Sequence, residues 1–180
     1  MRKEVFTIIA YPIPEIGEDF PEIFREIVKI NTLDYKKYQK IQQTIIDTLD
    51  TCEWIEIKGK GDNETDLLIH LHTLTDPKTQ TNFENCVADV NIPLGEVFTS
   101  PVLAGTGGML HVSKVYLNGL QFCDLKLVFD CGQVIDYSCS NFETEEENRK
   151  YIEDNILFHH PKLAMGEFAI GTNTTAYVAA

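Results

Sequence analysis

Two glutamates in similar settings are the residues of this chain best suited to chemistry. Glu96 lies in Asn91–Pro101 (Asn-Ile-Pro-Leu-Gly-Glu-Val-Phe-Thr-Ser-Pro), after a glycine and before a β-forming triplet. Glu167 lies in Gly166–Asn173 (Gly-Glu-Phe-Ala-Ile-Gly-Thr-Asn), again after a glycine and before a short apolar run. Two carboxylates on rigid, mostly apolar strands can be paired ligands of a divalent metal. The residues alone also fit a simpler interpretation, in which both are strand-end glutamates beside turns.

The histidines and cysteines give weaker signals. His70 and His72 would share one face of a strand, where two imidazoles could bind one metal, but we favour a solvent-facing strand end. His111 is predicted to be an ordinary strand histidine, and the adjacent His159 and His160 are expected to point apart. The five cysteines contain no Cys-x-x-Cys pair, which removes support for zinc-finger and thioredoxin-type sites. We expect all five to be structural thiols.

The charge of the chain limits its partners. Acidic residues number 28 and basic residues 15, which gives a net charge of −13. Such a field repels nucleic acids and anionic membrane surfaces, so we predict neither as a partner. No apolar run approaches the length of a membrane span, and the N-terminus has no apolar signal core.

Two amphipathic helices are predicted near the N-terminus, after a strand at Val5–Tyr11. The first is expected to begin at Asp19, with Glu22 closing a capping box. The second is expected to be capped by Thr32 and to pack on the domain through an apolar stripe with helical spacing. This stripe consists of Tyr38, Ile41, Ile45 and Leu49.

Strands joined by short turns are predicted for most of the remaining chain. Alternation with a period of two begins at Cys52, and Asp66–His72 is expected to form the partner strand. Asn118-Gly119 strongly predicts a β-hairpin, and Thr144 opens a capping box at the start of a third helix. Gly105–Gly108 lacks the Lys-Ser/Thr of a phosphate-binding loop, and we expect it to be a flexible connection beside the Glu96 site.

Three further strands are predicted close together in the second half of the chain. They are Leu110–Tyr116, Leu120–Phe129 and Val134–Tyr137. A meander of this kind with separate helices predicts an α+β fold, with an antiparallel or mixed sheet, hairpins and a few packed amphipathic helices.

Three motifs in order support a resemblance to a known family. They are the strand start Gly61–Leu67 ending in Thr-Asp-Leu, the pattern Asn-x-Pro-x-Gly-Glu-Val-Phe-Thr-x-Pro in Asn91–Pro101, and Gly-Glu-x-Ala-x-Gly-Thr-Asn in Gly166–Asn173. The span from about Ile55 to Ala180 resembles the metallo-aminopeptidases of the aminopeptidase T and aminopeptidase S type, which are thermophilic metalloproteases. The preceding Phe6–Leu49 is typical of a longer, mainly clostridial branch of that family.

The resemblance implies a cytoplasmic, homodimeric exopeptidase that removes N-terminal residues from peptides. It assigns Glu96 and Glu167 as ligands of two divalent metal ions in the full-length protein, which would be Zn, Co or Mg; for the fragment by itself, the alternative is that it binds none. Water between the metals, made nucleophilic by its lowered pKa, would attack the first peptide carbonyl. The catalytic residues of this chain stay unassigned.

The resemblance also limits what the chain is expected to do alone. Two histidine ligands, an aspartate ligand and a catalytic tyrosine are expected downstream of the second glutamate motif, whereas every histidine of this chain precedes Glu167. We therefore expect an excised fragment without peptidase activity of its own. Residues 1–51 would be an N-terminal strand and two-helix segment, and residues 52–180 the N-terminal part of a peptidase catalytic domain, truncated at its C-terminal end. The alternative is a non-catalytic peptide-binding or dimerisation module.

Overall fold

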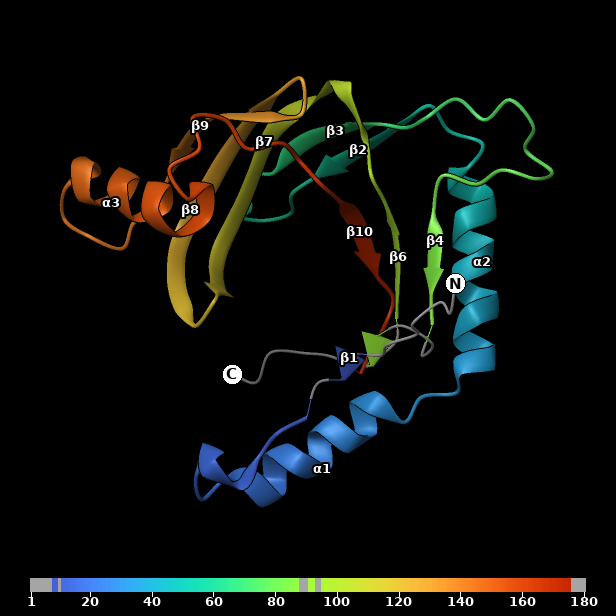
Figure 1. Ribbon diagram of the computed structural model, residues 1–180, viewed down its shortest axis with the longest axis horizontal. Coiled ribbons are helices and arrows are strands. Elements are labelled where there is room, and N and C mark those ends of the chain that lie inside the picture. The colour runs from blue at the N-terminus through green and yellow to red at the C-terminus, as the bar shows by residue number, and fades with distance from the viewer. Residues whose placement is uncertain (1–7, 10, 88–90, 93–94, 176–180) are drawn as a thin grey trace, which may run out of the picture. The chain divides into compact units, whose positions relative to one another are not determined.

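The computed structural model describes residues 8–9, 11–87, 91–92 and 95–175, and it divides the chain into two compact units. The first unit comprises Met1–Thr51, Leu74–Thr99 and Ala169–Ala180, and the second comprises Cys52–Thr73 and Ser100–Phe168. Antiparallel strands and separate helices occur in both units (Figure 1), so the predicted α+β class is confirmed. Among the described helices, none is long and apolar enough to cross a bilayer.

Short strands and two longer helices make up the first unit. Its helical elements are a 3₁₀ turn η1 (Pro14–Ile16), α1 (Phe20–Asn31) and α2 (Tyr35–Leu49). Its strands are β1 (Ile8–Ile9), β4 (Glu84–Cys86), β5 (Asn91–Ile92), β6 (Glu96–Thr99) and β10 (Phe168–Gly171). Strand β1 pairs in parallel with β5, and a separate sheet has the order β10-β6-β4. Helix α2 packs on β4 and β6 (Figure 1).

Helix α1 begins where predicted, with Asp19 at its N-cap position, but the predicted side-chain capping does not form, and the predicted cap of α2 is wrong. Asp19 has a helical backbone (φ −78°, ψ −1°) and its side chain makes no capping hydrogen bond. Helix α2 is capped instead by Asp34, whose carboxylate accepts from the Lys37 N–H at 3.1 Å. Because α1 continues to the residue before Thr32, the Thr32 hydroxyl donates to the Val28 carbonyl at 2.7 Å and closes α1.

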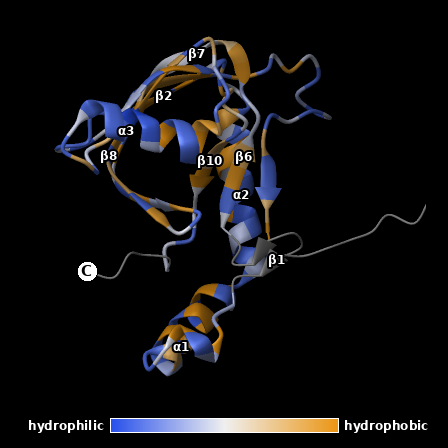
Figure 2. Cartoon of the chain, turned by 60° about the vertical axis from the view of Figure 1, so that its left-hand side comes forward, coloured by the Kyte–Doolittle hydropathy of each residue, from blue (hydrophilic) through white to orange (hydrophobic). Residues whose placement is uncertain are grey.

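The buried side of helix α2 is not the side that carries its predicted apolar stripe. Gln42 and Ile46 are 0% and 1% exposed, whereas Ile41 in the predicted stripe is 44% exposed. The expectation that the stripe packs on the domain is therefore wrong for Ile41. In α1 no residue is buried, although hydrophobic residues run along it (Figure 2).

A five-stranded antiparallel sheet with one helix on it forms the second unit. Its strands are β2 (Trp54–Lys58), β3 (Asp66–His70), β7 (Val102–Leu117), β8 (Leu120–Asp130) and β9 (Gln133–Ser138), in the order β2-β3-β7-β8-β9. Its helical elements are α3 (Glu145–Ile152) and the π-helical turn η2 (Glu153–Leu157). The core contains the fully buried Ile69, Phe122 and Ile152, and the ring of Tyr151 lies 4.7 Å from that of Phe122.

Turn chemistry explains the hairpins of this sheet. Asn118 and Gly119 have φ values of 51° and 78°, as the left-handed turn of a tight hairpin requires, so this prediction is confirmed. The Thr144 cap is also confirmed, because its hydroxyl accepts from the Glu147 N–H at 3.3 Å.

The flexible connection predicted at Gly105–Gly108 is wrong, because these residues belong to β7. A Cβ on Gly108 would overlap the carbonyl oxygen of β3, so glycine allows the two backbones to approach.

Some predicted features fall outside the described residues. The strand expected at Val5–Tyr11 is described only at Ile8–Ile9 and Tyr11, and Pro93 and Leu94 of the first glutamate motif are not described.

Candidate metal-binding glutamates

Glu96 is the first residue of β6, and its side chain is half-buried. Strand β4 runs antiparallel to β6, with Cys86 opposite Glu96 and Asn85 opposite Val97. The Asn85 side chain bonds to α2 through Gln42, and Val97 is 0% exposed, so this pair faces the helix. Because successive strand residues alternate between faces, Glu96 projects from the face of β6 away from α2.

The two glutamate motifs meet at Gly95. The Thr172 N–H donates to the Gly95 carbonyl at 2.6 Å. The φ of Gly95 is +124°, and a Cβ there would lie 2.6 Å from the Cβ of Asn173 and 2.9 Å from its backbone nitrogen. Any side chain at position 95 would therefore be strained and would displace Asn173. The glycine before Glu96 is required because the Thr-Asn pair that closes the second motif packs against it.

A buried amide joins this contact to α2. Gln42 is 0% exposed, and its Nε2 donates to the Asn85 Oδ1 at 2.7 Å and to the Cys86 carbonyl at 3.0 Å. Its Oε1 accepts from the Thr172 hydroxyl at 2.9 Å. One side chain thus holds β4 and the end of the second motif on the same helix. No sequence pattern predicts this role of Gln42, because its partners are scattered along the chain.

Glu167 is exposed and immediately precedes β10, which neighbours β6 in the sheet. It belongs to the second compact unit, whereas Glu96 belongs to the first. Within residues 8–9, 11–87, 91–92 and 95–175, no three His, Cys, Asp or Glu side chains gather closely enough to hold a metal ion. Carboxylates suit divalent cations as oxygen ligands, but transition metals also favour imidazole nitrogen. The assignment of Glu96 and Glu167 as metal ligands therefore stays a prediction.

The strand histidine pair predicted on β3 does not form a metal site in the described part of the chain. The ring of His70 stacks on Trp54 with a centroid separation of 4.0 Å, and its Nδ1 lies 2.7 Å from the Ala104 carbonyl oxygen. His72 follows the end of β3 and is exposed. This arrangement agrees with the preference for a solvent-facing strand end.

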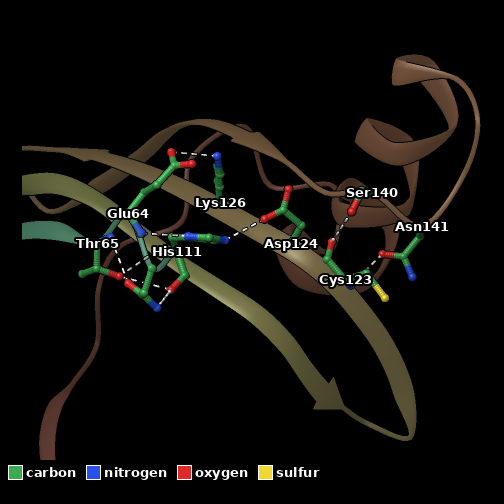
Figure 3. Close-up of polar contacts among 9 residues, drawn as sticks. Glu64, Thr65, His111, Cys123, Asp124, Lys126, Ser140 and Asn141 are labelled. Carbon is green, nitrogen blue, oxygen red and sulfur yellow. Dashed lines mark hydrogen bonds and ion pairs between the residues drawn. The ribbon is translucent and has the colours of Figure 1, made fainter. Parts of the chain in front are cut away.

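His111 is a buried histidine whose role the strand pattern did not reveal. It is 5% exposed, its Nδ1 accepts from the Glu64 N–H at 2.9 Å, and its Nε2 lies 2.6 Å from the Asp124 carboxylate (Figure 3). Since Nδ1 accepts, the ring carries its proton on Nε2 and donates it to Asp124. Both ring nitrogens are engaged within the protein, so His111 acts as a structural clamp.

Further polar contacts around His111 extend this clamp to the segment just before β3 and to β8. The Thr65 hydroxyl donates to the His111 carbonyl at 3.1 Å and lies 3.0 Å from its backbone nitrogen, which can donate in turn. Lys126 on β8 pairs with Glu64 at 2.8 Å (Figure 3), and this contact raises the pKa of Lys126. The network fixes the segment before β3 to β7 and β8.

A second polar cluster fastens α3 and η2 to β9. The Arg149 guanidinium donates to Asp136 at 2.9 Å and holds the pKa of that carboxyl below its usual range, with help from the Tyr137 N–H. The Tyr137 hydroxyl donates to Glu153 at 2.6 Å, which raises the pKa of Tyr137. Perturbed pKa values can indicate active sites, but here each has a structural ion-pair or hydrogen-bond partner.

Comparison with known proteins assigns the class and then the family. A family model described as thermophilic metalloprotease (M29) matches residues 11–178, and the class of this family is that of the metalloproteases. The chain belongs to the M29 family of thermophilic metalloproteases, and the resemblance inferred from the three motifs is confirmed. A search of curated proteins finds no match.

One solved structure supports the fold. Wild-type AmpT from Thermus thermophilus is similar with a TM-score of 0.58 and 19% sequence identity. The match covers 88% of this chain and 39% of that chain. The chain therefore spans well under half the length of this structural neighbour.

Proposed function

We propose that this chain is part of a metal-dependent aminopeptidase that removes N-terminal residues from peptides, and that Glu96 and Glu167 bind its two divalent ions. Membership of the M29 family supports peptidase chemistry. The observation that carries the assignment of Glu96 is the Gly95–Thr172 contact, at 2.6 Å, because it joins both glutamate motifs beside that carboxylate.

The residues of this chain have separate tasks in the proposed site. Glu96 and Glu167 supply carboxylate oxygens, and Gly95 with Gln42 holds the backbone from which Glu96 projects. The bound ions, which we propose to be Zn, Co or Mg, would supply a Lewis acid and a water of lowered pKa. The free amine of a peptide substrate would be attracted to the acidic site by its positive charge.

We expect no peptidase activity from this chain by itself. Two carboxylates without a third described ligand form a weak site for a transition metal. We also propose that the complete enzyme is a cytoplasmic homodimer, as the family resemblance implies.

Metal titration tests the role of the glutamates. In calorimetric titrations with Co²⁺, we expect weak binding by the wild-type chain and loss of the signal in Glu96→Gln and in Glu167→Gln. Glu143→Gln is a matched control, because Glu143 is exposed in the loop before α3. Equal binding by wild type and Glu96→Gln, or no binding by the wild type, would contradict the assignment.

An assay of peptidase activity tests whether the chain is inactive by itself, as we expect. We expect no hydrolysis of a leucine anilide by the chain with added Co²⁺ or Zn²⁺. Hydrolysis that is lost in Glu96→Gln would refute the inactivity while supporting the metal site. A stable dimer that binds no metal would favour a non-catalytic dimerisation module instead.

A further inference from the structure

Strand β2 forms an open edge of the five-stranded sheet. It lies at one end of the strand order, next to β3, and no other described strand pairs with it (Figure 1). The opposite edge strand, β9, is partly covered, because the Val134 N–H donates to the Leu163 carbonyl at 2.9 Å and Gln133 pairs with Ala164. An open edge presents a row of backbone donors and acceptors with which another extended chain can pair.

The register of β2 and β3 determines which backbone groups face this edge. In an antiparallel pair, residues directly opposite one another alternate between pairs that exchange hydrogen bonds and pairs that do not. The Leu71 N–H donates to the Glu53 carbonyl at 2.9 Å, so the odd-numbered positions of β2 bond to β3. The N–H and C=O groups of Trp54, Glu56 and Lys58 therefore point to the open edge.

The side chains of these three edge residues lie on one face of β2, because successive strand residues alternate between faces. The Lys58 ammonium pairs with Asp66 at 2.6 Å and with Glu56 at 3.1 Å. Two negative charges and one positive charge leave −1, and the Glu56 side chain is 62% exposed. The Glu56 carboxylate therefore has room to accept from a further basic group.

Trp54, the single tryptophan of the chain, places an aromatic surface beside this charge. Its indole stacks on the His70 ring with a centroid separation of 4.0 Å and an interplanar angle of 12°, and Trp54 is still 40% exposed. A Cβ on Gly105 would lie 2.7 Å from the indole, so glycine leaves room for this stack. A cation over the open face of an indole is attracted by the ring quadrupole, and an arginine guanidinium can also stack on it.

We propose that an extended, basic peptide binds along β2 as an additional antiparallel strand. Its residue opposite Trp54 is arginine, and its residue opposite Glu56 is lysine or arginine. The residues between them are apolar, because they fall on the face where Ile55 and Ile57 are half-buried. In this mode of recognition, main-chain hydrogen bonds provide affinity and alternate side chains provide specificity.

The charge of the chain favours this occupant over a second copy. Two antiparallel β2 strands centred on Glu56 would set the two Glu56 carboxylates opposite one another, where they repel. A basic peptide is instead attracted by the net charge of −13. The source of the peptide is a peptide substrate, because the chain belongs to a family of metalloproteases. This source rests on the proposed function, whereas the binding itself does not.

A fluorescence titration of Trp54 tests the binding, with a chelator present so that the outcome is separate from the metal titration. The probe is N-acetyl-Thr-Val-Lys-Val-Arg-Thr-amide, in which arginine falls opposite Trp54 and lysine opposite Glu56. Its blocked N-terminus removes the amine that the glutamates would attract. We expect a saturable change in indole emission with a dissociation constant on the order of 0.1–1 mM. Emission that does not change with added peptide would overturn the proposal.

Two methylated peptides test the backbone pairing without changing the protein. In the proposed register, the N–H of the lysine opposite Glu56 points to β2, whereas the N–H of the valine opposite Ile55 points away. N-methylation of the lysine should raise the dissociation constant about fivefold or more. N-methylation of the valine is the matched control and should change it less than about twofold. Equal losses from the two peptides, or no loss from the methylated lysine, would refute the strand pairing.

Glu56→Lys tests the selection by charge. It should raise the dissociation constant of the probe about fivefold or more, because attraction across the strands becomes repulsion. Lys58 keeps its closer partner Asp66 in this variant. Glu143→Lys is the matched control, because Glu143 is exposed in the loop before α3 and the net charge changes by the same amount. Unchanged binding in Glu56→Lys, or an equal loss in Glu143→Lys, would contradict the role of Glu56.

Discussion

Replacement of Gln42 by methionine tests the structural basis of the Glu96 site. Methionine keeps the length of the side chain but removes three hydrogen bonds, at 2.7 Å to Asn85, 3.0 Å to Cys86 and 2.9 Å from Thr172. Each bond contributes about 1 kcal/mol net, and a buried polar group that loses its partner costs about 1–3 kcal/mol. Since these terms overlap, we expect Gln42→Met to lower the free energy of unfolding of the first unit by about 2–4 kcal/mol.

Native-state hydrogen exchange measures this loss where it should occur. The Thr172 N–H that donates to Gly95 should exchange faster in Gln42→Met, whereas amides in the core of the second unit such as Phe122 should not. Gln39→Met is the matched control, because Gln39 is an exposed residue of the same helix and only its carbonyl accepts from Asn85. We expect its effect to stay within about 0.5 kcal/mol.

A double-mutant cycle separates the interaction free energy between Gln42 and Thr172 from the other effects of each substitution on stability. Thr172→Val removes the hydroxyl that donates to Gln42 but keeps the branched shape. If the two side chains act through one hydrogen bond, the double variant should be less destabilised than the sum of the single variants, by about 0.5–3 kcal/mol. Additive effects, or a Gln42→Met protein as stable as the wild type, would refute the reasoning.

Three further substitutions probe other parts of the chain. Gly95→Ala should destabilise the first unit by more than about 1 kcal/mol in chemical denaturation and weaken any Co²⁺ binding, because its φ of +124° and its packed neighbour exclude a Cβ. Asn148→Ala should cost about 2–4 kcal/mol by the same assay, because this buried amide makes four backbone hydrogen bonds to residues 141–144. Asp136→Asn should cost no more than about 1 kcal/mol at neutral pH, since the ion pair with Arg149 is largely exposed. Because the pair lowers the folded pKa of Asp136, the difference should vanish as pH falls through that pKa, below the ordinary value near 4.

Local signals predicted the second unit well. The Asn118-Gly119 turn and the Thr144 cap depend on residues within a few positions of one another, and both formed as expected. The alternation in β3 also holds, with Leu67 and Ile69 buried. The glycines in β7 were misinterpreted because their function depends on a partner strand far away in sequence. For the same reason, the strand pattern did not reveal the hydrogen bonds of His111, whose partners include Asp124, 13 positions later in the chain.

The buried side of α2 shows a different limit. A hydrophobic pattern identifies the most apolar side of a helix, but tertiary partners decide which side is buried. Here Gln42 is buried because Asn85, Cys86 and Thr172 satisfy its amide, and Ile41 is left exposed beside it. Of the predicted apolar stripe only Ile41 is exposed, whereas Tyr38, Ile45 and Leu49 are half-buried.

The glutamate motifs combine a structural requirement with a chemical one. Gly95 and the Thr172-Asn173 pair are needed for the close contact of two backbone segments, whether or not a metal binds. By contrast, Glu96 is half-buried and Glu167 is exposed, so neither carboxylate is part of that close backbone contact. Substituting the packing residues should therefore reduce both stability and metal binding, whereas Glu96→Gln should reduce metal binding alone. A Glu96→Gln variant that unfolds more easily than Gly95→Ala would show that Glu96 serves the fold rather than the metal.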